Sequence, residues 1–407
     1  MREYKAEYEL LAARLADSGI DVEAVKARLK AQAIETPSWG YADAGTRFGT
    51  YAQPGAALTI EEKLADAAQV HKFTGIAPAV AVHVAWDFPD GFDPALVEYA
   101  ASLGVRIGAI NPTCFEDPEG LMGTIANPQA RIRQKAIDHM LESVEIGRQA
   151  SSRNLSLWFA DGTNYPGQDD LIERRHRVAE SLQTVYQAMP ETMRMLIEYK
   201  PFEPAFYHTD IADWGMAYLF AKGCGERAKV LIDLGHHLHG TNIEHIVATL
   251  LDEGALGGFH FNNAKYADDD LVTGSVNPYQ DFLIFDQLVV AESKPAAAEI
   301  AYMIDQSFNV KPKLAGMIQS CLNIQRTYAK ALLVDRHKLA AARHESDIIG
   351  AEQVLIEAFS SDVEPLLMVV REEMGLEPEP LAAYLASGYK EQIEQERGIR
   401  EAGGGLG

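Results

Sequence analysis

The chain has 407 residues, of which 47% are hydrophobic, and it carries 36 basic against 59 acidic side chains, a formal net charge of −23. Such an acidic surface repels nucleic-acid backbones and anionic membranes, which disfavours both as partners, whereas a neutral, hydroxyl-rich substrate meets no such repulsion. No apolar run approaches the roughly 20 residues of a membrane span, and the charged N-terminal segment lacks the apolar core of an export signal. We therefore expect a cytoplasmic globular protein.

The three cysteines, Cys114, Cys224 and Cys321, are far apart in the sequence. They form neither a CxxC pair nor an even set that would suggest a disulfide framework. This spacing is typical of reduced thiols in a cytoplasm, so we expect three small buried residues.

Two amphipathic helices are expected within residues 1–32, and apolar runs rich in Val, Ile and Leu then alternate with helical stretches. Runs of this composition are typical of strands buried on both faces, as in a parallel sheet. The expected strands are 79–86, 105–111, 155–160, 194–199, 229–234, 257–262 and 298–305, with a weaker first candidate at 37–40 (PSWG). Helical patterns between them include 130–152, 171–189, 211–224, 241–254 and 278–292.

Strands that alternate with helices form right-handed βαβ units, and eight such units close a barrel. The pattern therefore predicts an α/β fold, a (β/α)8 TIM barrel. Residues 312–345 and 351–396 follow the last strand and are helical in pattern. We expect a barrel with N-terminal helices over 1–345 and a C-terminal helical extension with a glycine-rich tail over 346–407, packed on the barrel or on a neighbouring subunit.

Four successive expected strands each end in a residue of a metal-ligating type. These residues are Glu198, Asp233, His260 and Asp305. One such residue alone is more often a capping or core polar group. Because the C-terminal strand ends of a barrel converge, four together would place unpaired anions side by side, and a divalent cation would offset their repulsion. Oxygen-rich ligation with imidazole favours Mn²⁺, Mg²⁺ or Co²⁺ over a structural zinc.

A second cluster is suggested by His236, Asp268 and Asp270, which again combine one nitrogen with two carboxylates. The run of aspartates has an alternative interpretation as a solvated turn, since charge runs usually are exposed. Spacing alone leaves both interpretations open.

Several segments resemble those of bacterial L-rhamnose isomerases of the broad-specificity Pseudomonas type, which have a xylose-isomerase-like barrel. The resemblance runs in order from about residue 36 to 390 and is strongest in PSWGYADAGTRF, HVAWD, LWFADGTNYPGQ, IEYKPFEPAFYHTDIADWG, DLGHHLHGTNIEHIVA, GGFHFNNAKYADDDL and MIDQS. It implies an aldose–ketose isomerase that interconverts L-rhamnose and L-rhamnulose, also acts on D-allose, D-psicose and related sugars, and works by a metal-assisted hydride shift.

The resemblance also implies two divalent metal ions per subunit, with Mn²⁺ as the first choice and Co²⁺, Mg²⁺ or Zn²⁺ as alternatives. Glu198, Asp233, His260 and Asp305 would hold a structural ion. His236, Asp268 and Asp270 would hold a catalytic ion. The two ligand sets coincide with the two clusters suggested by the strand ends.

Further residues match positions that contact the sugar in this family. They are His83, Trp86, Trp158, Lys200 and Phe48. Aromatic faces pack against the C–H surfaces of a sugar, and the lysine can stabilise a developing negative oxygen. Without the resemblance, both tryptophans are more often core residues. Phe48 matches a phenylalanine that reaches into the neighbouring subunit's pocket, which implies a homotetramer.

Two positions depart from the family pattern as we read it. Asn263 stands where relatives carry Asp, and Phe308 stands where they carry His. The loop after NPTCF is also shorter. Both positions adjoin expected ligands, so substrate preference can differ from that of the relatives.

Three other functions are compatible with parts of the pattern. A sugar 3-epimerase shares the barrel but uses two glutamates as acid and base across one metal, whereas here the eighth strand ends in Asp305. A zinc-dependent DNA-repair endonuclease clusters similar ligands, but its surface should be basic. A catalytically inactive barrel would not be expected to keep all seven ligand-type residues.

Overall fold

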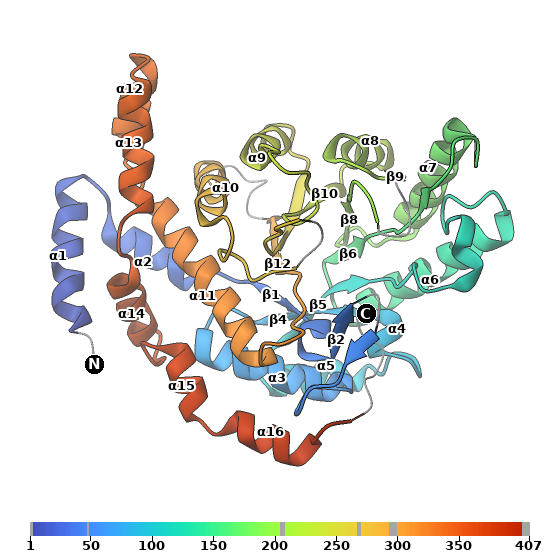
Figure 1. Ribbon diagram of the computed structural model, residues 1–407, viewed down its shortest axis with the longest axis horizontal. Helices are drawn as coiled ribbons and strands as arrows, with labels where there is room; N and C mark the ends of the chain where they lie inside the picture. Colours follow the sequence, from blue (N-terminus) through green and yellow to red (C-terminus); the bar gives the residue numbers. More distant parts are fainter. Residues whose placement is uncertain (1–2, 47–48, 204–207, 267–269, 293–298, 401–407) are drawn as a thin grey trace.

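In the computed structural model, which describes residues 3–46, 49–203, 208–266, 270–292 and 299–400, eight parallel strands close a barrel (Figure 1). Neighbours around the barrel are neighbours along the chain, and the first strand closes the ring by pairing with both the second and the last. The predicted fold class is confirmed. The strands are β1 (Glu35–Pro37), β4 (Ala79–His83), β5 (Arg106–Asn111), β6 (Asn154–Leu157), β8 (Arg194–Glu198), β10 (Ala228–Asp233), β11 (Leu256–Phe261) and β12 (Ala301–Ile304).

A helix follows each barrel strand and covers its outer side. Asp and Asn side chains begin several of these helices by accepting a first-turn backbone N–H, as Asp170, Asp213, Asn242 and Asn277 do. The barrel helices are α3 (Ile60–Thr74), α5 (Ala95–Ser102), α6 (Ala130–Gln149), α7 (Leu171–Ala188), α8 (Trp214–Cys224), α9 (Ile243–Asp252), α10 (Pro278–Ala291) and α11 (Lys313–Leu332). The five helices predicted between residues 130 and 292 agree with α6 to α10 to within a few residues.

Short elements lie at the C-terminal ends of the strands. The helical turns are η1 (Ser38–Tyr41), α4 (Val84–Asp87) and η2 (Pro118–Met122). Two small antiparallel ladders join β2 (Ala44–Thr46) to β3 (Gly49–Tyr51) and β7 (Gly162–Thr163) to β9 (His208–Thr209).

The sequence predicts the first strand at 37–40, which is wrong by two or three residues. The strand β1 is Glu35–Pro37, and the next residues turn into η1. Pro37 has no backbone N–H to continue the ladder, which accounts for the early end. The second strand also ends early, at His83 instead of residue 86, because the chain turns into α4.

Further helices precede and follow the barrel. They are α1 (Tyr4–Asp17), α2 (Val22–Lys30), α12 (Arg336–His344), α13 (Ile348–Phe359), α14 (Glu364–Glu373), α15 (Pro380–Ala386) and α16 (Tyr389–Arg397). In Figure 1 the last three pass along one side of the barrel, where α14 packs on α1 and α2, and α15 packs on α3 and α11. The predicted helical extension therefore packs on its own barrel, while the predicted division at residue 345 stays a prediction.

The core is continuous between the barrel and its helices. All three cysteines are buried, with free thiols, as expected. Within the described part of the chain, no helix is both long enough and apolar enough to cross a membrane.

Candidate metal centre and cavity

The side-chain alternation of the strands brings the four predicted ligands to one place. Leu196, Leu231 and Met303 belong to a small apolar layer inside the barrel. Glu198, Asp233 and Asp305 each follow one of these residues by two positions, so they point to the same interior at the C-terminal ends. His260 is in register with both Met303 and Asp233 on the neighbouring strands.

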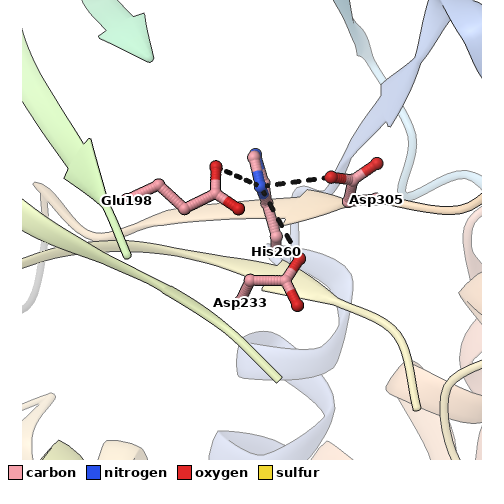
Figure 2. Close-up of side chains that lie close together, drawn as sticks. All are labelled: Glu198, Asp233, His260 and Asp305. Atoms are coloured by element: carbon pink, nitrogen blue, oxygen red, sulfur yellow. Dashed lines mark ion pairs between the residues drawn. The ribbon is translucent and has the colours of Figure 1, made fainter. Parts of the chain in front are cut away.

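The four side chains converge closely (Figure 2). One ligating atom from each of Glu198, Asp233, His260 and Asp305 lies within 4.8 Å of all the others. The Nδ1 atom of His260 is 3.2 Å from Glu198 Oε2, 3.5 Å from Asp305 Oδ2 and 3.9 Å from Asp233 Oδ2. Glu198, Asp233 and His260 are buried, whereas the Asp305 side chain is 21% exposed. The cluster is thus closed below and open on the side of Asp305.

Burial and neighbouring charges have opposite effects on the pKa values of the groups in this cluster. Burial opposes a proton on His260, but the carboxylates of Glu198, Asp305 and Asp233 outweigh it and raise the pKa of the imidazole. Burial also raises the pKa of the Glu198 carboxyl, but His260 and His236 together bring that pKa below its usual range. Three carboxylates around one imidazole thus favour a positive charge at this point, either a proton on His260 or a bound cation.

The donor set fits a divalent cation. The Nδ1 atom of His260 is buried and has no well-oriented hydrogen-bond partner among the described residues, although carboxylates surround it. Asp233 accepts hydrogen bonds from Gly235 N at 2.7 Å and from Asn262 Nδ2 at 2.9 and 3.0 Å, which fix its orientation. Three carboxylates with one imidazole are ligands that suit Mn²⁺, Mg²⁺ or Co²⁺, and such outer contacts commonly orient ligands.

Two of the three residues of the second predicted cluster, His236 and Asp270, line the same cavity. His236 is buried, with Nδ1 at 3.1 Å from both Glu198 Oε1 and Tyr199 O. Asp270 adopts a left-handed backbone conformation, with φ of 43°, and its Oδ1 is 3.4 Å from Asn262 Nδ2. Asn262 thus connects the two clusters through its contact with Asp233. Asp268 lies outside the described residues.

A cavity that is partly open to solvent lies beside the cluster. Aromatic and uncharged polar side chains make up much of its wall. His83, Trp158, Lys200, His236 and Asp270, all predicted site residues, line it together with Glu198, His260 and Asp305. The remaining wall residues are Trp39, Asn111, Pro112, Phe115 and Ser156.

Trp86 does not reach this cavity wall. Its ring packs on the His83 ring with a centroid distance of 4.1 Å, and its Nε1 donates to Glu116 Oε1 at 2.8 Å. It therefore supports His83 from behind and faces a neighbouring hollow. Phe48 lies outside the described residues, so its predicted role is not tested.

Two wall residues have distinct electrostatic states. The Lys200 side chain is 7% exposed, and its Nζ lies 2.7 Å from Glu203 Oε2 and 5.1 Å from the centre of the Trp158 ring. Burial, with smaller contributions from Lys63 and His260, lowers the pKa of His83 to about 3, so this imidazole is neutral near pH 7. A cation and a neutral imidazole on one wall can stabilise a negative oxygen and bind a hydroxyl group.

Trp39 and Asn262 are site residues that sequence reasoning missed. Trp39 lines the cavity and donates from Nε1 to Asp305 Oδ1 at 2.8 Å. It stands two residues after the first strand, at the edge where barrel sites lie, but the sequence predicts the PSWG segment to be the strand itself. Asn262 directly follows β11, but the sequence pattern indicates His260, two residues earlier, as the functional residue of this strand.

Comparisons with known proteins agree with this geometry. Residues 65–288 match the xylose isomerase-like TIM barrel family. A probable sugar isomerase of Rhizobium meliloti (strain 1021) is 43% identical over 405 residues, covering 98% of this chain and 94% of the relative. A probable sugar isomerase of Mesorhizobium japonicum is 39% identical over 406 residues, covering 98% of this chain and 94% of the relative.

Among solved structures, an L-ribulose 3-epimerase shares the fold, with a TM-score of 0.52 and 12% identity over 78% of this chain and 98% of that chain. At this identity the likeness concerns the fold alone. The family match and the two long alignments show that the chain belongs to the xylose isomerase-like TIM barrel family.

Proposed function

We propose that the protein is a metal-dependent aldose–ketose isomerase that interconverts L-rhamnose and L-rhamnulose and also accepts D-allose, D-psicose and related sugars. The observation that carries the proposal is the convergence of Glu198, Asp233, His260 and Asp305 beside a cavity lined by aromatic and polar side chains. Two relatives described as probable sugar isomerases support the reaction class. The choice of sugar rests on the resemblance to L-rhamnose isomerases.

Two divalent ions complete the proposed site, with Mn²⁺ preferred over Co²⁺, Mg²⁺ and Zn²⁺. Glu198, Asp233, His260 and Asp305 hold one, and His236, Asp268 and Asp270 hold the other. When bound, such ions polarise substrate oxygens and lower the pKa of water.

The chain's own residues bind and orient the open-chain sugar. The neutral imidazole of His83 exchanges a hydrogen bond with a sugar hydroxyl, and the face of Trp158 packs against sugar C–H groups. The ammonium of Lys200 stabilises negative charge at the reacting oxygen, since it lies in the wall with little exposure.

Hydrogen moves between C2 and C1 of the sugar as a hydride. The carboxylates of the described cavity wall are Glu198, Asp270 and Asp305, and all three belong to the proposed ligand sets. A proton-transfer route would need a carboxylate base that is free of a ligand role. The epimerase alternative is disfavoured for a different reason, because it uses two glutamates as acid and base across the metal and here the eighth strand ends in Asp305.

The proposal extends to assembly and location. A homotetramer in the cytoplasm, in which Phe48 of one subunit completes a neighbour's cavity, follows from the resemblance alone. Light scattering of the purified protein checks the mass, and Phe48→Ala in a tetramer should raise the KM for the sugar.

The test is ketose formation from a panel of aldoses by protein stripped with EDTA and then reloaded with Mn²⁺. L-Rhamnose turnover should vanish on stripping and return with the ion, and Asp305→Asn should stay inactive. No isomerisation with Mn²⁺ demonstrably bound, or epimerisation at C3 alone, would contradict the proposal. Solvent deuterium at C1 of the product would exclude the hydride route.

A further inference from the structure

A buried ion pair lies behind the cavity wall. Lys63 of α3 and Asp87 of α4 approach to 2.6 Å between Nζ and Oδ1, and their side chains are 2% and 0% exposed. Removing two charges from water is unfavourable, so a buried pair is often no more stabilising than apolar residues of the same size. Because such a pair often adds little stability, its other contacts indicate what it does in the protein.

The Asp87 carboxylate joins the ends of two adjacent barrel strands. Its Oδ2 accepts a hydrogen bond from Ser38 Oγ at 2.6 Å and another from the backbone N of His83 at 2.8 Å. Ser38 directly follows β1, His83 ends β4, and these strands pair in the barrel. Ser38 is fully buried as well, so the network has little competition from water.

Both strand ends lead to the candidate site. Trp39, the neighbour of Ser38, donates to the proposed ligand Asp305 and packs edge-on against His83 at 4.8 Å between ring centroids. His83 lines the cavity and packs against the tilted ring of Trp86. One carboxylate thus fixes the backbone positions from which two cavity-wall rings extend.

We infer that Lys63 and Asp87 are positioning residues, which set His83 and Trp39 in the cavity wall for sugar binding. The effect on sugar binding rests on the proposed function, whereas the effect on the rings does not. A carboxylate is needed because Asp87 only accepts: Lys63, Ser38 and the His83 backbone are all donors. In Asp87→Asn, the amide NH2 would face one of these donors.

Fluorine NMR of protein labelled with 5-fluorotryptophan reads the rings directly, because the chain has four tryptophans. Asp87→Asn should shift the signals of Trp39 and Trp86 and leave that of Trp214, at the start of α8 outside the barrel, in place. Ser38→Ala removes one hydrogen bond without leaving a buried charge unpaired, and it should shift Trp39 alone. If Asp87→Asn does not fold, Ser38→Ala and the double variant Lys63→Met/Asp87→Asn are measured in its place.

The matched control is Asp66→Asn. Asp66 also lies on α3, its side chain is 1% exposed, and it pairs with Arg397 Nη1 at 2.7 Å, on the side of α16. This variant should leave the fluorine signals of Trp39 and Trp86 unchanged. In the kinetic assay, Asp87→Asn or the double variant should raise the KM for the sugar about tenfold with kcat within about threefold, whereas Asp66→Asn should change neither.

The inference would be overturned if the Trp39 and Trp86 signals stayed in place in Asp87→Asn. It would also be overturned if Trp39 did not shift in Ser38→Ala and neither signal shifted in the double variant. An equal rise in KM for Asp66→Asn would overturn it too, since any lost ion pair on α3 would then have the same effect. If the wild-type protein turns over no sugar, the proposed function fails, and the fluorine signals still decide whether the pair positions the rings.

Discussion

The indole Nε1 of Trp39 donates a hydrogen bond of 2.8 Å to Oδ1 of Asp305. The two residues are 266 positions apart in the chain, and they meet because β1 pairs with β12 to close the barrel. The other oxygen of Asp305 faces His260 at 3.5 Å. The indole therefore holds one carboxylate oxygen and leaves the second directed into the cluster, as an orienting partner of a metal ligand does.

Replacing Trp39 by Phe should weaken metal binding. The substitution keeps an aromatic ring but removes the N–H that orients Asp305, and the loss of such an outer contact lowers metal affinity by about tenfold or more. Calorimetric titration of the stripped protein with Mn²⁺ measures the change. Trp214→Phe on α8 is the control and should leave the Kd unchanged. An unaltered Kd for Trp39→Phe would show that Asp305 needs no such support.

Removing the metal should destabilise the fold. An ion that binds only the native state contributes about 2.7 kcal/mol when its concentration is 100 times its Kd. The Tm should therefore fall with EDTA and recover with Mn²⁺. Asp233→Asn, with a changed ligand that is fully buried in the cluster, should lose most of this response, and Asp66→Asn should keep it. A wild-type Tm that ignores Mn²⁺ would count against the metal centre.

Lys200→Met should reduce kcat about 100-fold or more, with a smaller change in KM. The ammonium group is held by Glu203 and lies near Trp158 in the cavity wall, so its charge acts on the substrate with little solvent screening. Rates with saturating sugar measure the loss. Lys222→Met, an exposed lysine on α8, should retain wild-type kcat. Equal rates for Lys200→Met and Lys222→Met would remove Lys200 from the mechanism.

The four ligand-type residues could be located from the sequence because the ends of parallel strands converge whatever the loops between them do. Glu198, Asp233, His260 and Asp305 each lie at the end of an apolar run, so the ends of their strands were readable to within a residue, although β12 begins three residues later than predicted. The first strand is only three residues long and carries Pro37, which left too little periodicity to place it correctly.

The supporting contacts could not be read in the same way. Lys63 and Asp87 are separated by 24 positions and lie on two different helices, so only the closed barrel brings them together. Asn262 contacts both Asp233 and Asp270, yet its neighbours in the sequence give no sign of either partner. Such contacts depend on loop geometry, which no spacing rule fixes.

Asp281 should make stability depend on pH. Burial raises the pKa of its carboxyl group to about 7, although hydrogen bonds from Asn263 and from the backbone of Gly274 act in the opposite direction. In the unfolded chain an aspartate has a pKa of about 3.9. The native state therefore keeps a proton between about pH 4 and 7 that the unfolded state has lost, and the slope approaches 1.4 kcal/mol per pH unit.

The raised pKa of Asp281 fixes the direction of this pH dependence. The stability contributed by Asp281 is complete below about pH 4 and is lost as the pH rises to about 7. Asp281→Asn has no proton to lose, so the free energy of unfolding of the wild type, minus that of the variant, should fall by up to a few kcal/mol over this interval and then level off. Urea unfolding of both proteins at a series of pH values measures the difference. A difference that stays constant from pH 4 to 7 would mean that Asp281 ionises in the native state as easily as in the unfolded chain.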